Sequence, residues 1–337
     1  MRKYLLPKEG KFYKANLHAH GTGSDGEFTP QKMKEEFKKR GYDILSITEH
    51  EVLKNYYQYS DDDFLFINGY ELSITEDKSD DWAENKCCHL NLYCSDKNSI
   101  KQVCYHPDTI WFVGDEVKSK VEYYGDYYNR KYSVDGINDV IKQANDKGFI
   151  VCLNHPYWSL QEPEELKQYK GLFALEIYNT DNIYWGWSEY DVYAYDIMCR
   201  SGMRIAAQMA DDNHNHTKDD VFAGTFGGFD MIKAKELTYE SVFEALKNQD
   251  FYCSQGPEIY DLYVEDGYVY IKCSPVKSII KSTGIRDIDR VFDKNGGVVT
   301  EAKFKLEDKF QYVRFDLVDE KEKRANTRAY FSDEWKD

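Results

Sequence analysis

Short apolar segments of this chain repeatedly end in histidine or a carboxylate residue, and this feature restricts the possible folds more than any other. The strands expected at residues 14–17, 43–48, 64–70, 149–153 and 204–209 are followed by His18-Ala19-His20, Glu49-His50, Glu71, Asn154-His155 and Asp211-Asp212-Asn213-His214, respectively. In an extended strand, side chains two residues apart point the same way, so His18 and His20 direct two imidazoles to one point.

Helices are expected between these apolar strands. Two further strands are predicted at residues 88–93, which contain His89, and at residues 172–177, which contain Glu176; helices are predicted at 28–40, 135–147, 191–201 and 238–248. This alternation indicates parallel strands with helical crossovers. Seven such strands can close into a barrel, where polar residues at the carboxyl ends of the strands meet.

The pattern changes after Gly256-Pro257. Short strands are expected at residues 259–264, 268–274, 278–282, 291–293, 303–306 and 312–319, and no helix signal lies between them. Turn sequences such as Asp266-Gly267 separate these strands. We therefore expect an α/β domain at residues 1–256 and a small all-β, sandwich-like domain at residues 257–337.

Charge and cysteine content exclude several classes of protein. The formal net charge of −16 opposes a stable nucleic-acid partner, because phosphates attract basic surfaces. The eight cysteines form no CxxC pair, which disfavours a thiolate zinc knuckle. The first residues lack the apolar core of a signal peptide, and no apolar run approaches the ~18 residues of a membrane span. We expect a reduced, soluble, cytoplasmic protein without a membrane partner.

The candidate ligands suggest a metal centre. They are His18, His20, Asp25, His50, Glu71, His89, His155, Asp212 and His214. Each has an ordinary alternative, such as a polar strand end for His50, a core histidine for His89 or a solvated loop residue for Glu71. Their joint occurrence on successive strands favours metal binding, and imidazole mixed with carboxylate suits zinc, iron or manganese better than magnesium or calcium.

At this point the sequence resembles the PHP (polymerase and histidinol phosphatase) superfamily. The matching motifs are His18-Ala19-His20 with Ser24-Asp25-Gly26, Ile47-Thr48-Glu49-His50, Gly69-Tyr70-Glu71-Leu72-Ser73, Cys88-His89-Leu90-Asn91-Leu92, Asn154-His155-Pro156 and Asp211-Asp212-Asn213-His214. The resemblance covers roughly residues 12–256. The remaining residues are similar to the small β domain that follows some PHP phosphoesterase domains.

The resemblance implies a distorted seven-stranded barrel that holds two to three divalent transition metals. His18, His20, Glu71 and Asp212 would hold the first metal, Glu71, His89 and His155 the second, and Asp25, His50 and His214 the third. The implied reaction is hydrolysis of a small phosphomonoester by attack of a metal-bound hydroxide, with Asp212, His214, Glu71 and His20 as the catalytic residues. The alternatives are an exonuclease or oligonucleotide phosphodiesterase of the same fold, and a metal- or ligand-binding module without turnover.

Some features depart from the family pattern. Tyr157-Trp158-Ser159 stands where nucleotide phosphatases often have an arginine, Glu49 where many members have aspartate, and Asp25 where other branches have histidine. We expect Glu49 to orient a ligand. Candidates for binding the substrate are Arg130 and Lys131 in the tyrosine-rich stretch 95–133, Arg204 and His216, each of which has an alternative as a surface residue. The tyrosine-rich stretch is expected to cover the site.

Overall fold

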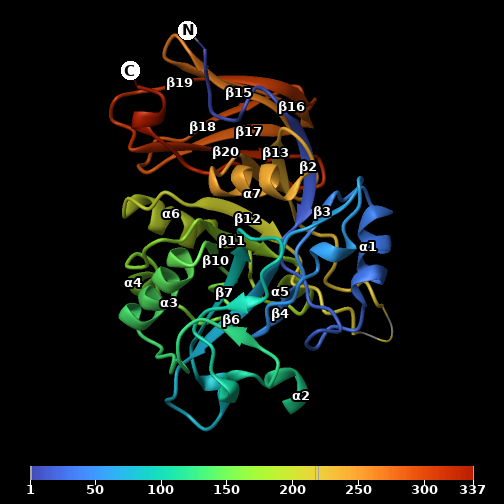
Figure 1. The fold of residues 1–337 in the computed structure, drawn as a ribbon. Helices are drawn as coiled ribbons and strands as arrows, with labels where there is room; N and C mark the ends of the chain where they lie inside the picture. Colours follow the sequence, from blue (N-terminus) through green and yellow to red (C-terminus); the bar gives the residue numbers. More distant parts are fainter. Residues whose placement is uncertain (1, 217, 219, 337) are drawn as a thin grey trace.

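The computed structural model describes residues 2–216, 218 and 220–336, and it contains two large β-sheets with helices beside them (Figure 1). The six-stranded sheet has the order β12 (Ala206–Ala210), β11 (Ala174–Asn179), β10 (Phe149–Leu153), β7 (Cys87–Cys94), β6 (Gly69–Thr75) and β4 (Thr48–His50). The ten-stranded sheet has the order β18 (Asp289–Phe292), β17 (Ser278–Thr283), β20 (Tyr312–Val318), β21 (Arg324–Asn326), β14 (Phe251–Ser254), β13 (Phe229–Ala234), β2 (Lys11–Asn16), β3 (Ile44–Leu45) and β5 (Leu65–Phe66), with β22 (Tyr330–Phe331) paired to β20.

Two smaller sheets and seven α-helices complete the described chain. The smaller sheets are β1 (Lys3–Tyr4), β15 (Ile259–Glu265), β16 (Tyr268–Val276) and β19 (Val299–Lys305), and the pair β8 (Lys101–Gln102) and β9 (Glu122–Tyr123). The helices are α1 (Pro30–Lys38), α2 (Asp115–Lys118), α3 (Val134–Asp146), α4 (Pro163–Leu166), α5 (Thr180–Tyr184), α6 (Val192–Arg200) and α7 (Tyr239–Lys247). Helix α1 lies within the predicted range 28–40 and begins at Pro30, because the Thr29 side chain accepts a hydrogen bond from the Lys32 amide and Pro30 occupies the first turn.

The six-stranded sheet is mixed, so the prediction of uniformly parallel strands is wrong. Strands β10, β11 and β12 are parallel, but β7 runs antiparallel to both β6 and β10. Residues 76–86 join β6 to β7 with a 3-10 turn and no crossover helix. Strand β7 therefore starts at the edge where β6 and β10 end, which places His89, near its beginning, at the same edge.

Two predicted strands are each divided between the large sheets. The strand expected at residues 43–48 becomes β3 in one sheet and β4 in the other, and the strand expected at 64–70 becomes β5 and the start of β6. The chain thus passes from sheet to sheet at residues 46–47 and 67–68. The mixed α/β class is confirmed. Closure into a seven-stranded barrel is not confirmed, because no continuous ring of paired strands joins the two sheets within the described residues.

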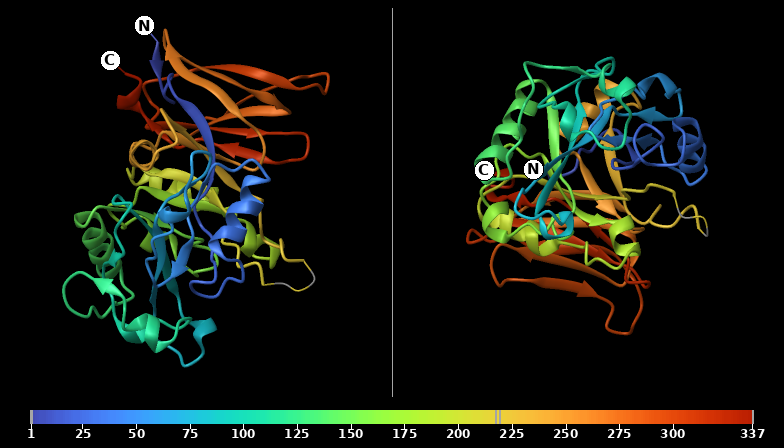
Figure 2. Two further views of the ribbon diagram at one scale, coloured as in Figure 1. Left: turned by 45° about the vertical axis from the view of Figure 1, so that its right-hand side comes forward. Right: turned by 90° about the horizontal axis from the view of Figure 1, so that it is seen from below.

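The C-terminal stretch forms strands as predicted, and these strands share sheets with the rest of the chain. Strand β21 pairs with β14, and β1, near the N-terminus, pairs with β15. Both chain ends lie at the same end of the molecule, opposite α2 (Figures 1 and 2). Tyr312, Ala329 and Phe331 belong to the hydrophobic core that contains α3 and β10. The predicted boundary between two domains at residues 256–257 stays a prediction. Strands on the two sides of this boundary pair with each other.

A buried ion network joins α6 to β20. The Arg314 guanidinium donates to both carboxylate oxygens of Asp196 at 2.9 Å and also to Asp316. Asn326 donates to Asp316, so the neighbouring strand β21 joins the same network. The side chain of Arg314 is only 6% exposed. The cation therefore compensates two carboxylates that water does not fully solvate.

Arg314→Met should lower the free energy of unfolding by roughly 3–5 kcal/mol, because it leaves buried carboxylates without a counter-charge. The matched control is Arg204→Met, which removes an exposed ion pair with Asp333 and should cost about 0–1 kcal/mol. Urea denaturation of both variants measures the difference. Equal effects would contradict the role given to this network.

Candidate metal centre

The structure brings all nine predicted ligands together in three adjoining groups. The groups are His18, His20, Glu71 and Asp212; Glu71, His89 and His155; and His20, Asp25, His50 and His214. In each group the potential ligand atoms lie within 4.8 Å of one another. Glu71 is shared by the first two groups, as predicted, and His20 is shared by the first and third, which was not predicted. All members come from residues before position 257.

Backbone pairing fixes the histidines that follow β2. The Asp212 amide donates to His18 O at 2.9 Å, and the His20 amide donates to Asn213 O at 3.0 Å. Thr48, at the start of β4, donates its amide to Ala19 O at 2.8 Å. The His18–His20 segment is thereby held between the segments that carry Asp212 and His50, so three ligand-bearing strands meet at one edge.

The first group is almost completely buried. His20 Nε2 lies 2.8 Å from Asp212 Oδ1, and His18 Nε2 lies 3.1 Å from the same oxygen. The other ring nitrogen of His18 is 2.8 Å from Glu176 Oε2. Asn179 donates to Glu176 at 2.8 Å and to Asp212 Oδ2 at 3.0 Å. Glu176 and Asn179 thus orient two ligands from behind, as such partners do in metal sites.

The second group surrounds one oxygen of Glu71. Glu71 Oε1 lies 3.1 Å from His89 Nδ1 and 3.3 Å from His155 Nε2. Asn154 donates to the same oxygen at 2.8 Å. The second nitrogen of His155 is 3.2 Å from Ser159 Oγ, which fixes the ring orientation. Neither Asn154 nor Ser159 stands out in the sequence except through its position beside His155.

The third group is more open to solvent. Asp25 Oδ2 lies 3.6 Å from His50 Nε2 and 3.5 Å from His214 Nε2. The rings of His50 and His214 both stack against the ring of His20, at centroid distances of 4.0 and 4.3 Å, and lie 5.7 Å from each other. Glu49 does not touch these ligands. It accepts hydrogen bonds from Gly21, Gly23, Ser24 and Tyr56, and so shapes the loop that carries Asp25.

Two ligands have an uncommon backbone conformation. His155 has φ of 25° and Asp212 has φ of 58°, both in the left-handed region that residues with a side chain seldom adopt. His155 lies two residues after the end of β10, and Asp212 lies two residues after the end of β12. Local strain of this kind is typical of functional sites, where the surrounding structure enforces it.

Opposite charges determine how these groups titrate. Burial alone would lower the pKa of His18, but the carboxylates of Asp212, Glu176 and Glu71 raise it well above its usual value. Burial would raise the pKa of Glu71, but His89, His18 and His155 hold it well below its usual value. For His20, burial and the neighbouring His50 and His214 lower the pKa to about 3. The centre therefore contains ionised carboxylates together with both charged and neutral imidazoles.

The donor atoms fit a metal centre better than a hydrogen-bonded network. Glu71 Oε2, Asp212 Oδ1 and His20 Nδ1 are buried and have no hydrogen-bond partner within the described residues. Buried polar atoms are normally satisfied. Yet His20 Nε2 approaches Asp212 Oδ1 and Glu71 Oε2 at 2.8 and 3.5 Å. Lone pairs that converge without hydrogen bonds are the arrangement that a cation would satisfy.

The candidate substrate-binding residues differ in how near they lie to the ligands. The buried side chain of Arg130 donates to Glu51, which directly follows His50, and to Ser73 O, so it lies beside ligand-bearing segments with its charge in an ion pair. Arg204 precedes β12, at the end of the strand opposite Asp212, and pairs with Asp333. The structure thus brings Arg130, but not Arg204, close to the ligands. Lys131 is exposed, and the exposed His216 has its ring 5.5 Å from that of His214; their roles stay predictions.

The tyrosine-rich stretch reaches the edge of the centre at one point. The Phe112 ring lies 4.9 Å from the ring of His50. Tyr105 and Ile110 of the same stretch form a small core with Val52, two residues beyond His50. Coverage of the whole site by this stretch stays a prediction.

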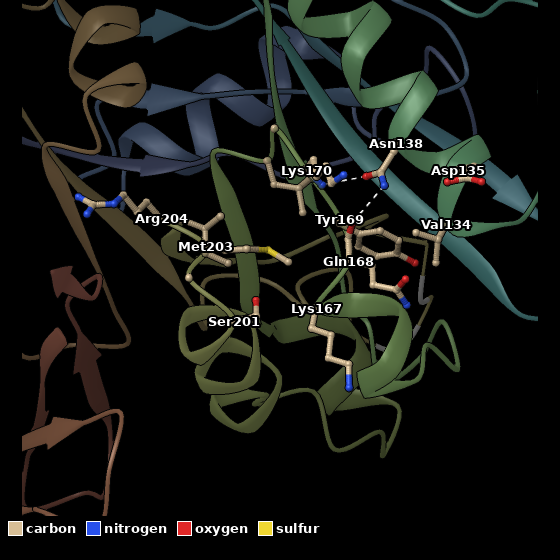
Figure 3. Close-up of a pocket in the computed structure, with 14 residues that line it drawn as sticks. Val134, Asp135, Asn138, Lys167, Gln168, Tyr169, Lys170, Ser201, Met203 and Arg204 are labelled. Atoms are coloured by element: carbon tan, nitrogen blue, oxygen red, sulfur yellow. Dashed lines mark hydrogen bonds between the residues drawn. The ribbon is translucent and has the colours of Figure 1, made fainter. Parts of the chain in front are cut away.

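A cavity of about 640 Å³ lies away from the ligands, at the amino ends of β11 and β12. Figure 3 shows its wall, where Asn138 of α3 accepts a hydrogen bond from the Lys170 amide and donates to Gln168 O. The cavity includes none of the nine ligands. Its position, opposite the carboxyl ends of these parallel strands, separates it from the candidate metal centre.

Comparison with known proteins gives structural matches only. No family model matches the chain, and no curated protein matches it. One similar solved structure is a two-domain protein from Bacteroides vulgatus that contains a predicted PHP-like metal-dependent phosphoesterase, with 17% identity, 97% of this chain and 98% of that chain covered, and a TM-score of 0.46. Another is a proposed metal-dependent phosphoesterase from Bifidobacterium adolescentis, with 14% identity, 64% and 91% covered, and a TM-score of 0.38. A third is an amidohydrolase from Chromobacterium violaceum, with 15% identity, 59% and 87% covered, and a TM-score of 0.39.

One of these structural matches is thus described as containing a predicted phosphoesterase of the PHP-like class that the sequence motifs resemble. In the described part of the chain, no helix has the length and apolar character needed to cross a membrane. The eight cysteines are buried and unpaired. Cytoplasmic location stays a prediction.

Glu71→Gln should lose more bound transition metal than His89→Ala, because Glu71 belongs to two groups and His89 to one. Elemental analysis after reconstitution and gel filtration gives the number of metals per chain. Glu84→Gln, at an exposed glutamate outside the groups, is the control and should bind metal like the parent protein. Equal metal content in Glu71→Gln and the control would refute the assignment.

Metal uptake by the metal-free protein should release protons and become tighter as the pH rises. The raised pKa of His18 keeps a proton on this ring at pH values where an ordinary histidine, with a pKa of about 6.5, has lost it. A metal must displace that proton, so affinity should go on rising at pH values above the pKa of an ordinary histidine. Calorimetry in buffers of different ionisation enthalpy counts the protons. In Glu176→Gln, which removes one charge that raises this pKa, fewer protons should be released; an unchanged count would contradict this explanation.

Proposed function

We propose that this protein is a metal-dependent phosphoesterase that hydrolyses a small phosphomonoester. The observation that supports this best is the sharing of Glu71 and His20 between adjoining groups of potential ligands. Shared ligands would hold two or three divalent transition metals next to one another, and the mixed imidazole and carboxylate donors suit zinc, iron or manganese. Such metals supply an activated water and stabilise the charge on the phosphoryl oxygens.

The residues of the chain have distinct parts in this proposal. His18, His20, Glu71 and Asp212 bind the first metal, while Glu176 fixes the tautomer and orientation of His18 through its 2.8 Å contact. Ser159 does the same for His155. No serine or cysteine nucleophile is required, because the attacking group is water. The buried position of these ligands keeps bulk water from competing with the substrate oxygens.

A small substrate fits the charge of the chain better than an oligonucleotide does. With a net charge of −16, long-range electrostatics repel a polyanion. Among the described residues, no lysine or arginine forms an ion pair with the nine ligands. Recognition of one phosphate would thus depend on metals, not on a basic groove.

The metal-loaded protein should hydrolyse p-nitrophenyl phosphate or a small phosphorylated metabolite, with little dependence on moderate salt. Asp212→Asn and His20→Ala should each lower kcat by about a thousandfold or more, because both remove ligands of the first group. Asp308→Asn, at a fully exposed aspartate, is the control and should leave kcat unchanged. A phosphatase assay with manganese, zinc and iron tests this.

The rival exonuclease function gives the opposite result in the same assay. It requires digestion of single-stranded oligonucleotides much faster than of any monophosphate, with affinity that falls steeply with salt. That outcome would replace the function proposed here.

A further inference from the structure

We propose that the alcohol part of the substrate carries a flat ring, and that Tyr157 and Trp187 bind this ring by stacking. The inference rests on the proposed function and adds a substrate class to it. Tyr157 follows His155 by two residues, and Trp187 lies in the connection between α5 and α6. Both therefore belong to loops that follow the carboxyl ends of β10 and β11, the edge at which the ligands meet.

The two rings form an exposed pair next to the second ligand group. Their centroids are 6.3 Å apart with the ring planes inclined at 71°, and Tyr157 and Trp187 are 50% and 42% exposed. A flat ligand ring can therefore stack on the face of one of them while it packs its edge against the other. Trp158, which follows Tyr157 in the sequence, has its ring 5.3 Å from that of His89 and 5.1 Å from that of His155. The segment that carries Tyr157 therefore already places one aromatic ring against the second ligand group.

A buried carboxylate holds this aromatic segment in place. Glu189 is fully buried, and its two oxygens accept hydrogen bonds from the Tyr157 amide at 3.2 Å and the Trp158 amide at 2.8 Å. The Trp187 amide donates to Asn182 O at 2.9 Å. The exposed rings therefore sit on fixed backbone, and pre-organised rings bind a ligand with less loss of entropy than mobile ones.

Aromatic faces also lie on the other side of the centre. The ring of Phe112, which is 51% exposed, contacts His50 of the third group, and the adjacent Trp111 is 74% exposed. The positive charge of the nearby Arg130 is balanced by Glu51, although its Nη2 has no hydrogen-bond partner within the described residues. The environment of the ligands thus favours a neutral, flat-faced group over further phosphates. Both an aromatic ring and a pyranose have such a face.

The test compares kcat/KM for phenyl phosphate, glucose 6-phosphate and glycerol phosphate, which has no ring. Tyr157→Ala and Trp187→Ala should lower kcat/KM for at least one ring-bearing substrate about tenfold, because KM rises. The kcat/KM for glycerol phosphate should change less than about twofold in both variants. Tyr157→Phe and Trp187→Phe keep the rings and should retain the parent values. Tyr260→Ala, at a 55% exposed tyrosine on β15, is the control.

Each outcome has a defined meaning. Loss confined to phenyl phosphate identifies an aromatic ring, and loss confined to glucose 6-phosphate identifies a sugar. An equal loss of kcat/KM for all three substrates, or no loss for any, overturns the stacking proposal. Neither result contradicts the proposed phosphoesterase function. If none of the three is hydrolysed, quenching of tryptophan fluorescence by phenol or glucose in the metal-free protein still tests the subsite. Binding that depends on Trp187 supports it, and absence of binding overturns it.

Discussion

One buried carboxylate, that of Glu71, determines much of this structure. Five imidazoles surround it, with ring nitrogens 2.9–3.5 Å from its oxygens; they belong to His18, His20, His50, His89 and His155. A buried negative charge is tolerated only with a counter-charge. Protons on the imidazoles can supply it in the metal-free protein, and metals can supply it when bound. Folding of the centre is thus coupled to whichever cation is present.

The convergence of these histidines depends on strand direction. Strand β7 runs against β6 and β10, so a histidine near its beginning meets histidines that follow the ends of other strands. The left-handed backbone at His155 and Asp212 then turns each chain at the point where its side chain must enter the centre. A shift of one residue in β7 would direct His89 to the opposite face of the sheet. Register and turn geometry are therefore as important as ligand identity.

The sequence identified the nine residues that the structure brings together, because most of them follow a recognisable apolar run. It could not predict that His20 serves two groups, since that depends on the distance between the first and third strand ends. The antiparallel β7 was missed because apolar runs contain no information on direction. The ion pair of Arg130 was missed for a similar reason: its partner Glu51 is distant in sequence, and only the folded chain shows that they pair. Glu189 was missed because it follows no motif and acts through backbone amides.

The C-terminal strands stabilise the centre without contributing a ligand. Strand β2 leads directly into His18 and pairs with β13, β13 pairs with β14, and β14 pairs with β21. An uninterrupted ladder of hydrogen bonds therefore connects the all-β stretch to the strand that presents His18 and His20. Arg314 adds a buried ionic link from β20 to α6. A boundary visible in the sequence pattern at residues 256–257 thus need not be a boundary in folding. The edge that carries the candidate metal centre is thus connected to the C-terminal strands by this ladder and this ion pair, so we expect the two to unfold together.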